Sequence, residues 1–168
     1  MSAAEPRPIV LGPEEGERAQ LMALGVRFML GSDATGGGFS LVEHPMGPRT
    51  LGSPMHVHQH EDEYSFVLEG SVGVHVGDDV RVAGPGALVV KPRQVWHAFW
   101  NAGDTPARIL EIISPGGFEG YFAELAPLMP PQVAEVDGEA VAAVAARYGL
   151  TLDFGSIERL SAEHGLTG

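Results

Sequence analysis

Three histidines and three carboxylates lie within eight residues of this chain, in the stretch HVHQHEDE from His56 to Glu63. Alternate side chains of a β-strand point to the same face, so His56 and His58 would project side by side, about 6–7 Å apart. Two imidazoles in that position can bind a single metal ion. An H-x-H pair on a strand is more often a surface feature than a metal site. A metal site is therefore indicated only if further candidate ligands are found.

Two more side chains are candidates to complete such a site. Glu63 has the wrong parity to share one unbroken strand with the histidine pair, but a turn at 59–62 would start a second, antiparallel strand and place its carboxylate across from the imidazoles. His97, in KPRQVWHAFWN, follows a Gly-Pro-Gly turn and shares a strand face with Val95 and Phe99. Three imidazoles and one carboxylate suit one divalent ion of Fe, Mn, Ni, Co, Cu or Zn, with a position open for water or substrate.

The other histidines and acids are expected to be structural or exposed to solvent. His60, Glu61 and Asp62 would form a wet turn between the two ligand strands, and His60 is the only other candidate base. His44 is expected to be an ordinary barrel or rim residue. His164 is expected on the surface of a helix.

Composition limits the partners of the chain. The formal charge of −12 argues against nucleic acid and anionic membranes, because their phosphates would repel it. The absence of cysteine excludes disulfides, zinc–thiolate sites and cysteine nucleophiles, and it suits the cytoplasm. The N-terminal residues resemble no signal peptide, and no window approaches the ~20 apolar residues of a membrane span. We therefore expect a cytoplasmic protein whose partner is a small molecule.

Short β-like runs separated by turns occupy the chain from 21 to about 115. Glycine and proline turns at this spacing favour an all-β sandwich or closed barrel. The expected strands lie at 26–30, 39–44, 64–70, 72–76, 80–83, 87–90, 97–101 and 107–113.

The pattern becomes helical after SPGG at 114–117. Asp137 and Ser156 are expected to cap two of the helices. The expected helices lie at 118–129, 138–149 and 156–165. The chain is thus divided into an N-terminal leader (1–20), a barrel (21–117) and a helical extension (118–168) that packs on the barrel or on a partner subunit.

The spacing of the candidate ligands resembles the two motifs of the cupin superfamily. The first motif is matched by His56-x-His58, four residues, Glu63, six residues and Gly70. The second is matched by Gly86, five residues, Pro92, four residues, His97, three residues and Asn101. The wider run from GPG at 84–86 to about 125 resembles a bacterial single-domain branch that is likened to quercetin 2,3-dioxygenase.

Two positions depart from the family pattern. Thr50 stands where a glycine usually precedes the first ligand by six positions, and Gln94 stands where a glycine usually follows the proline of the second motif. Both positions concern turn geometry and not metal ligation.

The resemblance implies a double-sheet jelly roll of six to eight strands with the metal ion inside the barrel, usually in a homodimer. Side chains that share strand faces with the ligands would line the substrate pocket, namely Ser65, Val67, Val95 and Phe99. The resemblance favours a metal-dependent dioxygenase acting on a small enolisable or aromatic, flavonol-like substrate, in which Glu63 is both ligand and base. The alternatives are a non-redox isomerase, decarboxylase or hydrolase, and a non-catalytic barrel that binds a small molecule.

Overall fold

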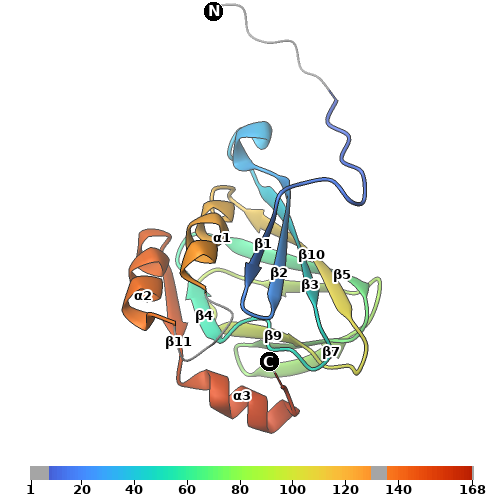
Figure 1. The fold of residues 1–168 in the computed structure, drawn as a ribbon, viewed down its shortest axis with the longest axis vertical. Coiled ribbons are helices and arrows are strands. Elements are labelled where there is room, and N and C mark those ends of the chain that lie inside the picture. Colours follow the sequence, from blue (N-terminus) through green and yellow to red (C-terminus); the bar gives the residue numbers. More distant parts are fainter. Residues whose placement is uncertain (1–7, 130–135, 168) are drawn as a thin grey trace, which may run out of the picture.

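Two antiparallel β-sheets face each other in the computed structural model, which describes residues 8–129 and 136–167 (Figure 1). The six-stranded sheet contains, in spatial order, β1 (Arg18–Leu21), β2 (Leu24–Leu30), β3 (Ser40–Met46), β10 (Ala107–Ser114), β5 (Asp62–Glu69) and β8 (Leu88–Lys91). The five-stranded sheet contains β11 (Leu150–Asp153), β4 (Met55–His58), β9 (His97–Asn101), β6 (Val72–Val76) and β7 (Asp79–Ala83). The expected all-β, double-sheet jelly roll is confirmed, with additional short edge strands.

The core lies between the sheets and follows from strict alternation along the strands. In β10, Ile109, Glu111 and Ile113 are buried, while the residues between them are partly exposed. The same period of two places Glu63, Ser65 and Val67 of β5 inside. The polar side chains of Glu63, Ser65 and Glu111 therefore point into the interior, because they occupy the inward-facing positions of their strands.

Helices cover one side of this barrel. They are α1 (Glu119–Leu125), α2 (Gly138–Arg147) and α3 (Ser156–His164), with 3₁₀ turns at Ser32–Thr35 and Ala126–Leu128. Figure 1 shows α1 beside α2; α2 packs against β11, and α1 contacts β1 and β3 of the six-stranded sheet. Phe122 and Val144 belong to the same buried cluster as Val42 and Ile109, so these helices share the apolar core of the barrel. The division at 20/21 and 117/118 stays a prediction, and β1 crosses the first of these boundaries.

One expected helix cap is present and the other is not. The Asp137 carboxylate accepts hydrogen bonds from the backbone amides of Glu139 and Ala140, at 3.0 and 3.1 Å. Ser156 makes no capping hydrogen bond to α3, so this expectation was wrong. Its hydroxyl instead accepts a hydrogen bond from the backbone amide of Met55 at 2.8 Å and thereby ties α3 to β4.

The connection between the two ligand strands differs from the expected hairpin. β4 pairs with β9 and β11, whereas β5 pairs with β10 and β8 of the other sheet. The turn at 59–62 therefore carries the chain from one sheet to the other. Glu63 still faces the histidines, because the inner faces of two packed sheets point towards each other.

A strand that the sequence analysis missed supports the histidine strand. β11 pairs antiparallel with β4, and its Leu150 and Leu152 lie opposite His58 and His56. Four residues between two helices are too few to show a period of two convincingly. Only the edge of β4 gives this segment its partner.

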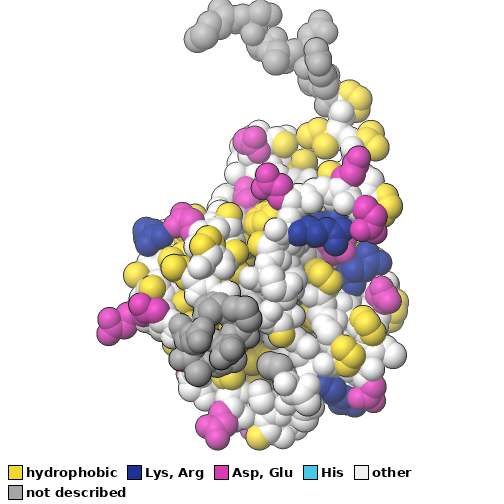
Figure 2. Space-filling model, viewed as in Figure 1, with side chains coloured by type: hydrophobic (Ala, Val, Ile, Leu, Met, Phe, Trp, Pro, Cys, Tyr) yellow, Lys and Arg dark blue, Asp and Glu magenta, His cyan; other side chains and the backbone are white. Residues whose placement is uncertain are grey.

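The acidic surplus is distributed over the surface. Figure 2 shows acidic side chains scattered among basic ones over the visible face, without a single dominant patch. In the part of the chain that the structure describes, no helix is long and apolar enough to cross a membrane.

Candidate metal centre

The structure brings together the four side chains that the sequence marked as metal ligands. His56 and His58 lie on β4, His97 lies opposite His56 on the neighbouring β9, and Glu63 reaches in from β5. All four residues are buried, and one ligand atom from each lies within 4.8 Å of the others. The inner faces of the two sheets therefore form one cluster of three nitrogens and one oxygen.

Backbone hydrogen bonds fix two of the rings. Nδ1 of His56 lies 2.9 Å from the carbonyl oxygen of Pro54, and Nδ1 of His97 lies 2.9 Å from that of Val95. A carbonyl only accepts, so each Nδ1 carries the proton and each neutral ring turns the lone pair of Nε2 towards the cluster. Nε2 of His97 then faces Oε2 of Glu63 at 3.1 Å. Two acceptors at this distance repel each other, so the pair requires a cation nearby.

Burial favours the form of the imidazoles that binds metals. Burial, followed by the neighbouring rings of His97 and His58, lowers the pKa of His56 well below its usual value. Burial also lowers the pKa of His97. Both rings are therefore neutral at pH 7, as ligation requires. The donor set fits a divalent ion of Fe, Mn, Ni, Co, Cu or Zn without selecting among them.

His58 shows a second sign that the cluster fits a metal ion. Its side chain is 1% exposed, yet neither ring nitrogen has a hydrogen-bond partner among the described residues. Buried polar atoms are rarely left in this state. Nε2 of His58 lies 3.5 Å from Oε1 of Glu63, and Nδ1 lies 3.4 Å from Oε2 of Glu61.

The position of Glu61 differs from the sequence expectation. Its side chain is only 12% exposed and turns towards His58 instead of lying in a wet turn. A carboxylate behind a ligating imidazole commonly orients the ring and makes it more basic. Nothing in the local sequence distinguishes it from Asp62, which pairs with Arg93 at the surface.

A charged network that the sequence analysis missed lies beside Glu63. Nζ of Lys91, on β8, lies 3.0 Å from Oε2 of Glu63 and 2.8 Å from Oε2 of Glu111. The hydroxyl of Ser65 donates to the same Glu111 oxygen at 2.7 Å. A signal was present in the sequence, because Lys91 and Glu111 occupy inward positions of the alternating runs LVVK and ARILEIIS.

The network determines the ionisation of these groups. Burial by itself would raise the pKa of Glu63, but the ammonium of Lys91 and the nearby imidazoles outweigh it, and that pKa lies well below its usual value. Burial raises the pKa of Glu111 to about 7, against the opposing effect of Lys91. Burial would lower the pKa of Lys91, but the two carboxylates raise it. Glu63 and Lys91 are therefore both charged at neutral pH.

The residues expected to line a substrate pocket are partly interior. Ser65, Val67 and Phe99 are buried and face inwards, whereas Val95 is only partly buried. The Ser65 hydroxyl is already engaged with Glu111. Their role in binding a substrate stays a prediction.

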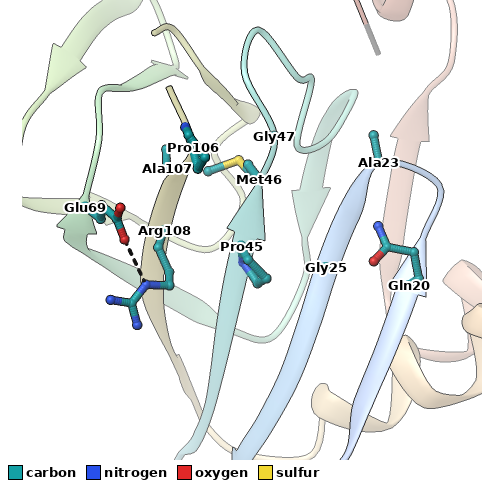
Figure 3. Close-up of a pocket in the computed structure, with 10 residues that line it drawn as sticks. All are labelled: Gln20, Ala23, Gly25, Pro45, Met46, Gly47, Glu69, Pro106, Ala107 and Arg108. Carbon is teal, nitrogen blue, oxygen red and sulfur yellow. Dashed lines mark hydrogen bonds and ion pairs between the residues drawn. The ribbon is translucent and has the colours of Figure 1, made fainter. Parts of the chain in front are cut away.

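The two clefts described at the surface lie away from this cluster. One cleft lies on the outer side of the six-stranded sheet and has a volume of about 340 Å³. Figure 3 shows Gly25, Pro45 and the ion pair of Arg108 with Glu69 at its border. The second cleft, of about 550 Å³, is apolar and includes Leu11 and Phe39. Neither cleft is lined by one of the four cluster residues.

One of the remaining histidines, His44, agrees with the sequence expectation of a barrel residue, and another, His164, does not. His44 lies inside the barrel with 2% exposure, its Nδ1 is 3.0 Å from the carbonyl oxygen of Gly25, and it contacts Phe122 edge-on. His164 is half-buried and stacks on Trp100, with ring centroids 4.1 Å apart, so it is less exposed than the sequence predicted. His60 is exposed.

The sequence between β3 and β10 matches a known family model. Residues 43–113 match the model described as "Cupin domain". Within this barrel, residues 43–113 are therefore assigned to the cupin domain family. The matched segment contains all four residues of the candidate metal cluster.

The chain is similar to a curated protein, the tetracenomycin polyketide synthase protein TcmJ of Streptomyces glaucescens. The two are 38% identical over 87 residues, and this matched region covers 51% of this chain and 50% of TcmJ. The chain thus spans about half the length of the curated relative that it matches.

Solved structures share the cupin fold at low sequence identity. KdgF from Halomonas sp. is 16% identical with a TM-score of 0.60, over 68% of this chain and 99% of that one. A predicted oxalate decarboxylase from Thermotoga maritima is 19% identical with a TM-score of 0.58, over 64% and 99%. A sugar phosphate isomerase from Silicibacter pomeroyi is 22% identical with a TM-score of 0.56, over 63% and 75%. Such likeness establishes the fold alone.

The turns of the cupin motifs have the geometry that their glycines suggest. Gly70 and Gly86 have φ values of 78° and 86°. Gln94, which replaces the usual glycine, also has a positive φ of 63°, and its backbone amide donates to the carbonyl of His58 at 2.7 Å. The turn therefore forms without glycine, in a conformation that most side chains disfavour.

Proposed function

We propose that this protein is a metal-dependent cupin enzyme that acts on a small organic molecule. The observation that carries the proposal is the buried cluster of His56, His58, Glu63 and His97. Its inward-facing acceptor atoms are close together, and a cation between them would satisfy them all. The three imidazoles and Glu63 would hold one divalent transition-metal ion.

The dioxygenase hypothesis is the leading candidate for the reaction. When bound, a redox-capable ion would supply Lewis acidity and electron transfer. Glu63 would take the proton of a substrate hydroxyl, and the buried Val67 and Phe99 would exclude water. The bound ion would acidify a coordinated hydroxyl, so that Glu63 can accept its proton. An enol or flavonol carries such a hydroxyl, and the similarity to a polyketide synthase protein supports an enolisable substrate.

A non-redox reaction is the second candidate. Isomerisation, decarboxylation or hydrolysis needs groups that move protons, and Lys91 with Glu111 forms a buried pair of such groups next to the cluster. The same pair weakens the case for a non-catalytic binding barrel, because that reading depended on the lack of acid or base residues beyond the ligands.

Metal loading and oxygen uptake test the proposal. The stripped protein and its His56→Ala variant would be offered each of the six ions, and bound metal would be measured by elemental analysis. Loaded protein would then be mixed with quercetin or acetylacetone as probes, in air and without oxygen. We expect near one ion per chain, lost in His56→Ala, and oxygen consumption that needs the ion.

Each other outcome has a defined meaning. Probe conversion that persists without oxygen would favour the non-redox reaction. Metal binding without any conversion in either condition would count against the enolisable substrate class. The absence of bound metal from the wild-type protein would overturn the enzyme proposal and leave a metal-free binding barrel.

We also propose that the partner of the chain is a second copy of itself. Apolar side chains cover the outer face of the six-stranded sheet, where Phe66 lies opposite Leu88, and Tyr64 opposite Val90. Phe66, Leu88 and Val90 are 38%, 57% and 48% exposed. A contiguous apolar face of this kind is typical of an interface, and a two-fold axis would let it cover itself. The expected cytoplasmic location stays a prediction.

A further inference from the structure

Three neighbouring strands direct charged side chains to one point beside the metal cluster. Lys91 of β8 lies directly opposite Glu63 of β5 in the register, and Glu111 of β10 lies opposite Ser65. Lys91 and Glu111 are each 1% exposed. The ammonium lies between the two carboxylates and 5.0 Å from the ring centroid of Phe99.

Stability alone gives no reason for this arrangement. Charges taken out of water lose hydration, and well-packed apolar residues can replace a buried ion pair without loss of stability. The inward positions of these strands otherwise hold apolar residues such as Val67, Ile109 and Ile113, which are fully buried. The pair must therefore be understood through the group that it contacts, which is Glu63.

The two oxygens of Glu63 have different surroundings. Oε2 lies 3.0 Å from Nζ of Lys91 and 3.1 Å from Nε2 of His97, whereas Oε1 lies 3.5 Å from Nε2 of His58. His97 needs the Nε2 lone pair to bind a metal, so it cannot also donate to Glu63. Lys91 is then the donor that holds Oε2.

We propose that Lys91 is a positioning residue for Glu63. Its ammonium holds Oε2, so that Oε1 is the oxygen presented to the metal ion. Glu111, which is itself held by the Ser65 hydroxyl, keeps the ammonium in place and balances its charge. The inference rests on the proposed metal site but does not depend on which reaction the enzyme catalyses.

A charge-balanced double variant tests the proposal. Lys91→Met with Glu111→Gln removes one charge of each sign at nearly constant volume, so it removes the hydrogen bond to Glu63 without changing the net interior charge. The measurements are the dissociation constant of Co²⁺, by competition with a chelator, and the visible absorption of bound Co²⁺, which reports its coordination. We expect a 10- to 100-fold weaker Co²⁺ complex with a changed spectrum.

Four further variants separate position from charge and from folding. The first, Lys91→Met alone, removes both the hydrogen bond to Glu63 and the positive charge. Glu111→Gln alone retains Lys91 against Glu63 and is expected to bind Co²⁺ within about threefold of wild type. Lys91→Arg retains a donor and is expected to keep most of the wild-type affinity for Co²⁺, a result that can be measured against the wild type even if the double variant unfolds. Arg27→Met with Glu43→Gln removes a buried ion pair of the same sheet away from the site and is expected to leave the affinity unchanged.

The contrary outcomes are distinct. Wild-type affinity and spectrum in a folded double variant would overturn the positioning role and leave the metal site intact. Tighter binding by Lys91→Met alone, with an unchanged double variant, would show that Lys91 acts only through its charge. A loss in Lys91→Arg as large as in the double variant would also overturn the proposal. A wild-type protein that binds no Co²⁺ or other ion would overturn this inference together with the proposed function.

Discussion

Glu61 and His58 form a carboxylate–imidazole pair behind the metal cluster, with Oε2 and Nδ1 3.4 Å apart. If the pair closes to hydrogen-bond distance when a metal ion is bound, the carboxylate would favour the ring form that has its proton on Nδ1 and would leave Nε2 for the ion. We predict that Glu61→Ala weakens binding of a divalent ion roughly tenfold and that Glu61→Gln weakens it less. Equilibrium dialysis against Zn²⁺ measures both effects.

His60 provides the matched control for this prediction. It lies in the same turn but is exposed. His60→Ala is expected to bind Zn²⁺ as the wild type does. Equal affinities of Glu61→Ala and wild type would show that the ring of His58 needs no support from the turn.

His44 makes the stability of the metal-free protein depend on pH. Burial lowers its pKa from 6.5 to about 4. Between these values the unfolded chain binds a proton that the folded protein does not. The free energy of unfolding should therefore fall as pH drops from 6.5 to 4. Below pH 4 the loss that comes from His44 is complete and is on the order of 3 kcal/mol.

The variant His44→Asn isolates this contribution. Its amide can still donate to the carbonyl of Gly25, but it does not titrate. Urea unfolding at pH 7 and pH 4.5 should show a smaller loss of stability in the variant than in the wild type. An identical loss in both proteins would mean that other groups carry the acid sensitivity.

At the level of secondary-structure elements, β6 and β9 pack closely only because Gly73 has no side chain. A Cβ at this position would overlap the indole of Trp100, which is 2% exposed and opposite Gly73 in the register. The indole cannot move outwards, because His164 of α3 stacks on it. We predict that Gly73→Ala lowers the free energy of unfolding by about 2 kcal/mol, measured by urea denaturation.

Gly84 offers a control within the same kind of turn-rich sequence. No atom lies within 4 Å of a Cβ built there, and its φ is not positive. Gly84→Ala should change stability by less than about 0.5 kcal/mol. If the two variants lost the same stability, the loss would come from glycine replacement in general and not from contact with Trp100.

At the scale of the whole molecule, the apolar outer face of the six-stranded sheet predicts a dimer of the 17.7 kDa chain. We expect light scattering coupled to gel filtration to give twice the chain mass for the wild type. Phe66→Asp with Leu88→Asp should give a monomer, because a two-fold interface would bury four carboxylates without partners.

Val82 supplies the control for this experiment. It is 65% exposed but lies on β7, in the other sheet. Val82→Asp should remain dimeric. A wild-type monomer would overturn the homodimer proposal, and a dimer that both variants retain would place the interface elsewhere.

The sequence by itself indicated the candidate ligand set and the fold class. Alternation with a period of two puts His56 and His58 on one face, and the spacing of the two motifs identifies Glu63 and His97. Glycine and proline turns divide the remaining chain into strands. These are local properties, so they can be recognised before the chain folds.

Only the tertiary structure decided what surrounds those ligands. Whether β4 pairs with β5 or faces it across the core depends on contacts between residues far apart in sequence. The same holds for β11, which among the described strands pairs with the edge of β4 alone. Lys91 and Glu111 lie on separate strands, and their contact with each other and with Glu63 forms only when β5 lies between those strands. A charged side chain is stable inside a protein only beside a partner, and here the partner comes from another strand, so it cannot be identified before the sheet forms.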